Sequence, residues 1–380
     1  MSASLIQPAL GYLLLCATAI YAVLALAARQ RWRQRIATIP LPTPTTPVTV
    51  LKPLFGAEPR LYENLRSFCV QDHPQFQLLF GLHAADDAAL PVVERLKAEF
   101  PLLDIGVVID PRIHGINLKV ANLINLLPEA RHGWLLLADS DIAAPLDLLR
   151  RVTAPLADRQ VGVVTCLYGG RPVGPLWARL GGQFIDDWFA PSVVLSHAFG
   201  GRRFAFGATI ALRREVLDRI GGFEALADHV ADDWWLGELT RRAGFRTVLS
   251  EAAVTTDVIE TRLSDLAARE LRWLRSIRRI EPLGYAFLFI CFSSPMIVIG
   301  GWLASGGPLA LTLALVTFAA RLMLGFDRQR KPLDSLKNMA LVPLRDSLSL
   351  LLWTTALAGR VVRWRGRPMK IAPLTARRRT

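Results

Sequence analysis

Uncharged apolar runs lie near both ends of the chain, and short apolar runs alternate with amphipathic segments between them. Residues 5–28 carry no charge and are long enough to cross a bilayer as a helix. Two later apolar runs, residues 284–305 and 309–324, are joined by an uncharged Gly-Gly-Pro turn at 306–308. We therefore expect a membrane anchor at the start of the chain and a helical hairpin after the middle region.

A further apolar run, residues 339–359, differs from the others because it contains Arg345 and Asp346. Basic residues flank it on both sides, which favours a re-entrant or interfacial helix over a simple span. The alternative is a helix inside a bundle that buries the adjacent charges. The sequence leaves both arrangements open.

The middle region has the pattern of an α/β fold. Strands are predicted at residues 48–54, 76–82, 105–109, 134–138 and 161–167, and helices at residues 59–70, 88–100, 118–127 and 145–156. Continuous apolar strands that alternate with helices indicate a Rossmann-like, mostly parallel sheet covered on both faces. Ligands of such sheets bind beyond the carboxyl ends of the strands.

The net charge of +13 is concentrated beside the apolar runs. Residues 326–380 carry 13 Lys or Arg against 3 Asp or Glu, and residues 29–35 add four arginines, so the rest of the chain is close to neutral. Basic flanks suit anionic lipids and a cytoplasmic location of the middle region. Nucleic acid is therefore excluded as a partner, and the phospholipid bilayer is expected as one.

A strand-end carboxylate pair predicts a metal site. Asp139 and Asp141 follow the buried strand at 134–138, and alternate carboxylates there can both face the ligand cleft. Hard divalent cations, Mg²⁺ or Mn²⁺, prefer such oxygen ligands and are completed by substrate phosphates. The chain has no GxxxxGK[ST] and no GxGxxG after a strand, which excludes the usual ATPase and dinucleotide sites.

Two further acidic pairs carry alternative interpretations. Asp86 and Asp87 follow the strand at 76–82. A ligand site and a helix cap or turn are equally good explanations of an acidic residue at this place. Asp232 and Asp233 precede a Trp-Trp pair and a helical segment.

A basic and aromatic motif precedes the helical hairpin. In the segment RELRW, Arg269, Arg272 and Trp273 have the i, i+3 and i+4 spacing that places them on one helix face. Arginine binds phosphate oxygens bidentately and keeps its charge at any working pH. The motif indicates a site for a phosphorylated leaving group, whereas anchoring at lipid headgroups is the simpler alternative.

Taken together, these motifs resemble those of the ceramide glucosyltransferase family of membrane GT-A glycosyltransferases, including bacterial relatives that act on hopanoid lipids. The resemblance runs from about residue 50 to residue 279. It rests on six short motifs in order, LKPLFG (51–56), HAADD (83–87), GINLKVANL (115–123), DSD (139–141), ADDWW (231–235) and RELRW (269–273).

The resemblance implies roles for the acidic residues. Asp86 or Asp87 would contact the uridine, and Asp139 with Asp141 would form the metal-diphosphate site. Asp233, with Asp232 as the alternative, would be the catalytic base that takes the proton from the acceptor hydroxyl in one in-line displacement.

The resemblance also implies roles for basic and polar residues. Arg269, Arg272 and Trp273 would hold the departing diphosphate or line the acceptor entrance. The family run that includes Asn117, Lys119 and Asn122 would touch the nucleotide, although a polar helix start explains these residues as well. His197 is a candidate for approaching the acceptor, with a structural role as the alternative, and Phe206 to Thr209 would form the floor of the sugar pocket.

The sequence thus predicts an inverting transferase that moves one hexose, glucose or N-acetylglucosamine, from a UDP-sugar to a hydroxyl of a membrane lipid, either ceramide or a hopanoid polyol. The expected location is the bacterial inner membrane, with several passes and a cytoplasmic catalytic domain. A processive polysaccharide synthase is the alternative within the same chemistry, and a non-catalytic membrane adaptor is the alternative outside it.

The expected domains follow the composition. They are an anchor at residues 1–28, a basic and Pro-rich linker at 29–47, a GT-A domain at 48–280, transmembrane or re-entrant helices at 281–360 and a basic tail at 361–380.

Overall fold

The computed structural model describes residues 3–43, 46–326, 332–359, 361–364 and 367–370. The chain divides into two compact units. Residues 38–171 and 201–257 form one, here called the α/β unit, and residues 1–37, 172–200 and 258–380 form the other, the helical unit. Most of the predicted tail at 361–380 lies outside the described residues.

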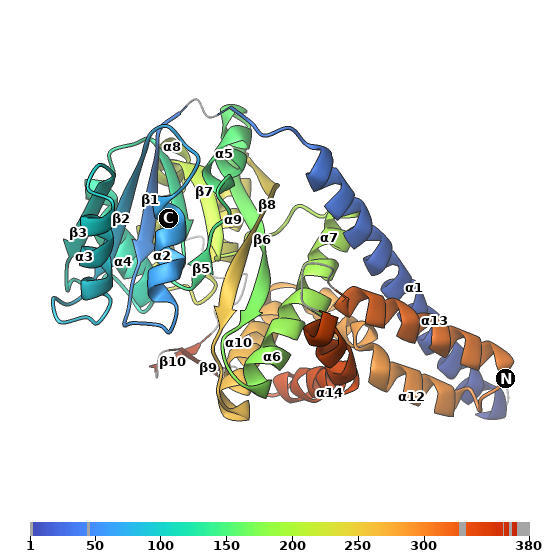
Figure 1. Cartoon of the computed structure of the whole chain (residues 1–380). Coiled ribbons are helices and arrows are strands. Elements are labelled where there is room, and N and C mark those ends of the chain that lie inside the picture. The colour runs from blue at the N-terminus through green and yellow to red at the C-terminus, as the bar shows by residue number, and fades with distance from the viewer. Residues whose placement is uncertain (1–2, 44–45, 327–331, 360, 365–366, 371–380) are drawn as a thin grey trace, which may run out of the picture. The chain divides into compact units, whose positions relative to one another are not determined.

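The α/β unit is built on an eight-stranded mixed sheet with the order β3-β2-β1-β4-β7-β6-β8-β5 (Figure 1). Its strands are β1 (Val48–Pro53), β2 (Phe76–Leu82), β3 (Asp104–Ile109), β4 (Trp134–Ala138), β5 (Ile142–Ala143), β6 (Val161–Pro172), β7 (Thr209–Arg213) and β8 (Arg246–Val258). Strands β1 to β4 are parallel, with Val48 opposite both Phe76 and Trp134. The predicted Rossmann-like α/β core is confirmed.

Antiparallel strands extend this core. Strand β7 runs antiparallel to both β4 and β6, and β5 runs antiparallel to β8. The sheet is therefore parallel from β3 to β4, and its other half contains antiparallel pairs. The helices of this unit are α2 (Leu61–Cys69), α3 (Leu90–Glu99), α4 (Leu118–Leu126), α5 (Leu148–Thr153), α8 (Arg214–Arg219) and α9 (Asp232–Arg242).

The core of the α/β unit consists of the apolar faces of the strands and of α2, α3 and α5. Leu78, Phe80 and Leu136 are fully buried there with Phe68 of α2. Burial of both sheet faces is what the continuous apolar strands predicted. Because both faces of the sheet are apolar, the polar groups lie beyond the carboxyl ends of β1, β2 and β4.

The helical unit contains the apolar segments. Its helices are α1 (Ala3–Thr38), α6 (Leu176–Gln183), α7 (Ala190–Ala198), α10 (Leu263–Ile280), α11 (Pro282–Ala286), α12 (Ser293–Leu303), α13 (Pro308–Gly325) and α14 (Pro332–Ala356), and a π-helical turn, Phe184–Phe189, joins α6 to α7. Within the described residues, two helical segments are long and apolar enough to cross a membrane, Ile6–Thr38 and Pro308–Gly325.

The predicted hairpin is present with a shortened first arm. Helices α12 and α13 are joined by Ser305, Gly306 and Gly307, which all have positive φ. The apolar run at 284–305 is divided into α11, a 3-10 turn at Leu288–Cys291 and the 11-residue α12. Helix α12 is too short to span a bilayer by itself.

The predicted charged run at 339–359 lies in the continuous helix α14, and both of its charges are buried. Arg345 forms a bidentate ion pair with Glu270 of α10, at 2.9 and 2.8 Å. Asp346 pairs with Arg321 of α13 at 2.8 Å and accepts from the backbone N–H of Ser294 at 3.1 Å. The adjacent charges thus face different helices, as expected for a bundle helix rather than for a surface element.

Candidate active site

Asp139 follows β4 directly, at the carboxyl end of the parallel strands. Its Oδ1 lies 2.5 Å from Nζ of Lys119, and its side chain is 35% exposed. Its backbone carbonyl accepts a 2.8 Å hydrogen bond from Nζ of Lys52, a buried lysine on β1. Lys119 therefore binds the carboxylate of Asp139 and Lys52 binds its backbone carbonyl, while the side chain stays partly open to solvent.

Asp141 lies two residues after Asp139, in the loop between β4 and β5. Its Oδ2 accepts a 2.6 Å hydrogen bond from the hydroxyl of Thr256, and its backbone carbonyl accepts from the N–H of Asp257. Burial raises the pKa of Asp141, and the charges of Asp139 and Glu58 raise it further. This repulsion between carboxylates is what a bound cation would relieve.

Asp232 and Asp233 are the first two residues of α9, and Asp232 lies near the same lysine, Lys119. Nζ of Lys119 lies 3.7 Å from Oδ2 of Asp232, so Lys119 stands between Asp139 and Asp232. Burial lowers the pKa of Lys119, but these carboxylates outweigh that effect and raise it overall. Asp139, Asp232 and Lys119, distant in sequence, therefore form one cluster.

Asp233 is held by backbone groups. Its Oδ2 accepts a 2.8 Å hydrogen bond from the N–H of Gly207, and its Oδ1 accepts one of 2.7 Å from the N–H of Trp234. Burial raises its pKa to about 6, and the negative charge of Asp232 acts in the same direction. A carboxylate with such a pKa is suited to take up a proton near neutral pH.

Lys52 was not singled out as a site residue by sequence reasoning. Its ammonium lies 3.8 Å from the ring centre of Phe68, and burial lowers its pKa to about 7 although Asp139 and Asp141 act against that shift. A lysine inside an otherwise apolar strand is the signal that marks it in the sequence.

Gly207 permits the position of Asp233. A Cβ atom placed on Gly207 would lie 3.2 Å from Oδ2 and 3.3 Å from Cβ of Asp233. The predicted floor segment at 206–209 therefore contacts the proposed base directly. A side chain at this position would require Asp233 or the backbone of Gly207 to shift by a few tenths of an ångström.

We expect Gly207→Ala to lower the rate of catalysis at this site by about tenfold to a hundredfold, because a misplacement of a reacting group of up to 1 Å has effects of that order. Steady-state kinetics would measure the change. Gly133→Ala is the matched control, since a Cβ there meets no atom within 4 Å. Equal rates for the two variants would show that the contact with Asp233 does not matter.

Asp86 and Asp87 have different surroundings in the structure. Oδ1 of Asp87 accepts hydrogen bonds of 2.9 Å from the N–H groups of Gly56 and Ala89, which is the behaviour of a turn residue. Asp86 is exposed. Of the two, Asp86 is the one whose carboxylate is open to a ligand.

The side chains of Asn117 and Asn122 form hydrogen bonds with other groups of the protein. Asn117 is fully buried at the N-cap of α4, accepts from the N–H groups of Lys119 and Val120, and donates to the carbonyl of His229. Asn122 donates to the carbonyl of Gly81 at 2.8 Å. The bonds of Asn117 match the alternative interpretation of a polar helix start, and that of Asn122 joins the interior of α4 to β2.

The RELRW segment lies on α10 in the helical unit. Nη1 of Arg269 pairs with Glu260 at 2.8 Å, and its guanidinium lies over the ring of Trp273 at 5.2 Å. Nε and Nη2 of Arg269 are buried and have no hydrogen-bond partner among the described residues. Arg272 is half-buried on the same helix. Arg269 thus retains two buried donors.

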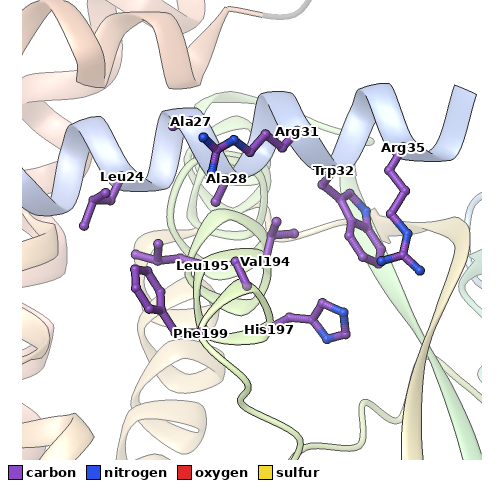
Figure 2. Close-up of a pocket in the computed structure, with 11 residues that line it drawn as sticks. Leu24, Ala27, Ala28, Arg31, Trp32, Arg35, Val194, Leu195, His197 and Phe199 are labelled. Atoms are coloured by element: carbon purple, nitrogen blue, oxygen red, sulfur yellow. The ribbon is translucent and has the colours of Figure 1, made fainter.

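The remaining candidate, His197, also lies in the helical unit. It is on α7, where its ring meets that of Trp32 edge to face at 5.4 Å (Figure 2). Both residues line an open pocket between α1 and α7.

A divalent cation fits the donor set of the α/β unit. Asp139 and Asp141 supply carboxylate oxygens, and burial together with the charge of Asp139 raises the pKa of Asp141. No group of three or more His, Cys, Asp or Glu side chains suited to a metal occurs in the described part of the chain. The two carboxylates would therefore rely on substrate oxygens to complete the coordination.

Comparisons with known proteins agree with these motifs. Ceramide glucosyltransferase 1 of Caenorhabditis elegans is 25% identical over 236 residues, covering 62% of this chain and 50% of that protein. Ceramide glucosyltransferase 3 of the same organism is 24% identical over 260 residues, covering 65% and 56%. The chain thus spans about half the length of these curated relatives.

A solved structure shares the fold. A mannosyltransferase from Pyrobaculum calidifontis, in complex with GDP-Man and Mn2+, aligns with a TM-score of 0.50 and 21% identity over 91% of this chain and 99% of that one. The predicted GT-A fold class is confirmed. The sequence matches glycosyl transferase family 21 over residues 11–376, and the predicted likeness to ceramide glucosyltransferases is confirmed. With its fold and its motifs in agreement, this chain belongs to glycosyl transferase family 21.

Proposed function

We propose that this glycosyltransferase moves a single hexose from a UDP-sugar to a hydroxyl group of a membrane lipid, with inversion at the anomeric carbon. The observation that carries the proposal is the cluster of Asp139, Lys119 and Asp232, with Asp233 next to it and held by two backbone N–H groups. This cluster combines a donor-binding carboxylate with a carboxylate of raised pKa. An inverting transfer needs both.

In the proposed reaction the acceptor oxygen attacks the anomeric carbon while the bond from that carbon to the UDP oxygen breaks. Asp233 takes the proton of the acceptor hydroxyl, and UDP leaves with the bonding electrons. The N–H groups of Gly207 and Trp234 fix the orientation of both carboxylate oxygens. A fixed base avoids the cost of reorientation during the reaction.

Asp139 and Asp141 would hold Mg²⁺ or Mn²⁺ in this proposal, and the cation would neutralise charge on the diphosphate. Lys119 and Lys52 place two further positive groups on Asp139. Asp86, exposed beyond β2, is proposed to face the nucleoside. In the described relative from Pyrobaculum calidifontis a nucleotide sugar and Mn2+ are bound together, which supports this arrangement.

Arg269, Arg272 and Trp273 are proposed to bind the departing diphosphate. The support is local: Nε and Nη2 of Arg269 are buried without a hydrogen-bond partner among the described residues, and buried donors of this kind are costly unless a ligand satisfies them. A diphosphate offers the acceptors that a guanidinium fork prefers.

The acceptor is proposed to be a lipid with a free hydroxyl, ceramide or a hopanoid polyol, in the cytoplasmic leaflet of a bacterial inner membrane. Two described helices are apolar and long enough to span a bilayer, and α1 ends in a basic segment. Basic flanks on the cytoplasmic side follow the positive-inside rule. The ceramide glucosyltransferase relatives support a lipid acceptor.

The test is sugar transfer by membranes that contain the full chain, offered UDP-glucose or UDP-N-acetylglucosamine with ceramide or bacteriohopanetetrol. We expect one donor and acceptor pair to yield a glycolipid with a single hexose. Mass spectrometry of the product would identify both substrates and the number of sugars added, and NMR would determine the anomeric configuration. A product with many sugars would favour a processive synthase instead.

We expect a chelator to abolish this transfer, and Mg²⁺ or Mn²⁺ to restore it, because the diphosphate charge needs a cation. Asp139→Asn should lower the rate by at least about a hundredfold, as for the loss of a group that stabilises developing charge. Asp104→Asn is the matched control, because Asp104 begins β3 and pairs with Arg131 at the protein surface. Full activity of Asp139→Asn in the presence of chelator would contradict the proposal.

A further inference from the structure

The loop that carries Asp141 is attached to strand β8 at two points. Thr256 donates its hydroxyl to Oδ2 of Asp141 at 2.6 Å, and the backbone N–H of Asp257 donates to the carbonyl of Asp141 at 3.0 Å. The short strand β5 continues this contact, since Ile142 pairs with Thr256. Two consecutive residues of β8 therefore fix both the backbone and the carboxylate of Asp141.

Asp257 is itself fixed by a closed ring of three side chains, which come from α2, β6 and β8 (Figure 1). Nδ2 of Asn64 donates to Oδ2 of Asp257 at 2.8 Å, and Nε of Arg171 donates to Oδ1 of Asp257 at 2.6 Å. The ring closes where Nη2 of Arg171 donates to Oδ1 of Asn64 at 2.7 Å. Each of the three residues thus bonds to the other two.

The ring is largely buried. The side chain of Asp257 is 3% exposed and that of Arg171 is 32% exposed, while Asn64 is fully buried. A buried carboxylate is costly unless a counter-charge and hydrogen-bond donors satisfy it. Here both carboxylate oxygens of Asp257 and the amide oxygen of Asn64 accept a hydrogen bond. The ring therefore depends on which of its atoms are donors and which are acceptors.

Helix α2 also binds the part of the chain that follows Asp141. The hydroxyl of Ser67 accepts a 2.9 Å hydrogen bond from the N–H of Ala144 and donates to the carbonyl of Asn64 at 2.6 Å. The loop is thus bound by β8 at Asp141 and by α2 three residues later. Because the ring joins Asn64 of α2 to Asp257 of β8, it holds these two supports of the loop together.

We propose that Thr256 and Asp257 are positioning residues for Asp141. The hydroxyl of Thr256 sets the rotation of the Asp141 carboxylate, and the ring around Asp257 fixes the strand that carries this hydroxyl. This inference rests on the proposed role of Asp141 in holding a divalent cation. Partners that orient a metal-binding side chain typically contribute about tenfold to a hundredfold to metal affinity. The effect of both residues is therefore on cation binding.

The test measures binding of Mn²⁺ to the purified full chain in phosphatidylcholine nanodiscs with UDP, by electron paramagnetic resonance, against nanodiscs and UDP without protein. Thr256→Val keeps the shape of the side chain and removes the hydroxyl, so we expect Mn²⁺ to bind about tenfold more weakly. Thr255→Val is the matched control, because alternate residues of a strand face opposite sides of the sheet. We expect its Mn²⁺ affinity to stay within about twofold of wild type.

An exchange within the ring tests the role of Asp257. Asp257→Asn sets an amide nitrogen against Nδ2 of Asn64, and turning either amide over only moves the conflict to Arg171, which also donates. We expect this variant to bind Mn²⁺ about tenfold more weakly. Asn64→Asp combined with Asp257→Asn gives every donor an acceptor again and keeps the net charge. It should recover Mn²⁺ binding to within about threefold of wild type.

Equal Mn²⁺ affinity of Thr256→Val and Thr255→Val would overturn the role of Thr256. Wild-type affinity in Asp257→Asn, or no recovery in the exchanged variant, would overturn that of Asp257. Thr256→Val removes neither charge nor volume, so it stays decisive if a ring variant fails to fold.

A failure of the proposed function gives a different result in the same measurement, which does not depend on sugar transfer. If Asp141→Asn binds Mn²⁺ as the wild type does, the proposed cation site is wrong and this inference falls with it. If Asp141→Asn loses Mn²⁺ binding while Thr256→Val and Asp257→Asn keep it, only the positioning roles are wrong.

Discussion

We expect Asp233→Asn to lower the rate of sugar transfer by about 10²- to 10⁴-fold, which is the usual contribution of a positioned general base, the role proposed for Asp233. The variant keeps the size of the side chain and one oxygen that accepts from a backbone N–H, so the fold and donor binding stay intact. Its KM for the UDP-sugar should change little. The measurement is kcat and KM for the donor in detergent or nanodiscs, with the glycolipid as product.

Asp232→Asn is the matched control, because it removes a carboxylate from the adjacent position. We expect it to retain most of the activity if Asp233 is the base. Loss of activity in Asp232→Asn together with retention in Asp233→Asn would assign the base to Asp232. Equal activity of both variants and the wild type would contradict the catalytic role of the pair.

The pH dependence distinguishes these residues further. A base acts in its deprotonated form, so the rate should rise with pH through about 6, the pKa to which burial and Asp232 raise Asp233. Asp232→Asn removes one of these causes and should move the acidic limb to lower pH. An acidic limb that does not move in Asp232→Asn would show that Asp232 does not act on the base.

Arg345→Met destabilises the helical unit by about 3–5 kcal/mol, because it leaves the buried Glu270 without its counter-charge. Glu270 is fully buried, and both of its carboxylate oxygens bind the guanidinium of Arg345. Arg345 also donates to the carbonyl of Leu180 and lies over the ring of Phe184. Thermal unfolding in detergent, followed by tryptophan fluorescence, would measure the loss.

The pH dependence of that loss has a definite sign. Burial raises the pKa of Glu270 even with Arg345 present, and removing Arg345 raises it further. A protonated Glu270 tolerates burial, whereas an ionised one does not, so the stability of Arg345→Met should fall as pH rises above about 4, where glutamate in the unfolded chain ionises. The double variant Glu270→Gln, Arg345→Met should recover most of the loss at neutral pH.

Arg179→Met serves as the control for the ion pair. Arg179 and Asp334 are 3.5 Å apart, with side chains that are 28% and 46% exposed, so this pair should contribute at most about 1 kcal/mol. A loss in Arg345→Met no larger than in Arg179→Met would contradict the structural role of the buried pair.

Much of the α/β unit could be predicted because its signals are local. The strands at 76–82 and 134–138 were predicted with the bounds that the structure gives, and α4 with a difference of one residue. Apolar strands and amphipathic helices have characteristic periods that a short window reveals. The antiparallel strand pairs were not predicted, because the direction of a strand depends on its partners rather than on its own residues.

The candidate site was predictable in part. Asp139 directly follows β4, where ligands of α/β sheets bind, so it is recognisable from its position. Asp233 was singled out by the family resemblance, because its place at the start of α9 does not mark a site by itself. Lys119 was expected to touch the nucleotide, and the structure shows it between Asp139 and Asp232. For Asn117 the sequence left two interpretations open, a contact with the nucleotide or a polar helix start. Its burial and its capping bonds to α4 agree with the helix start.

The sequence by itself determined the element types, the apolar helices, the basic flanks and the family motifs, because each depends on neighbouring residues. Only the tertiary structure decided which charges meet: Lys119 with Asp139 and Asp232, and Arg345 with Glu270. A charged side chain can be buried only if a distant segment supplies its partner, and local periodicity contains no information about that partner. Pairing of this kind is therefore a property of the folded chain.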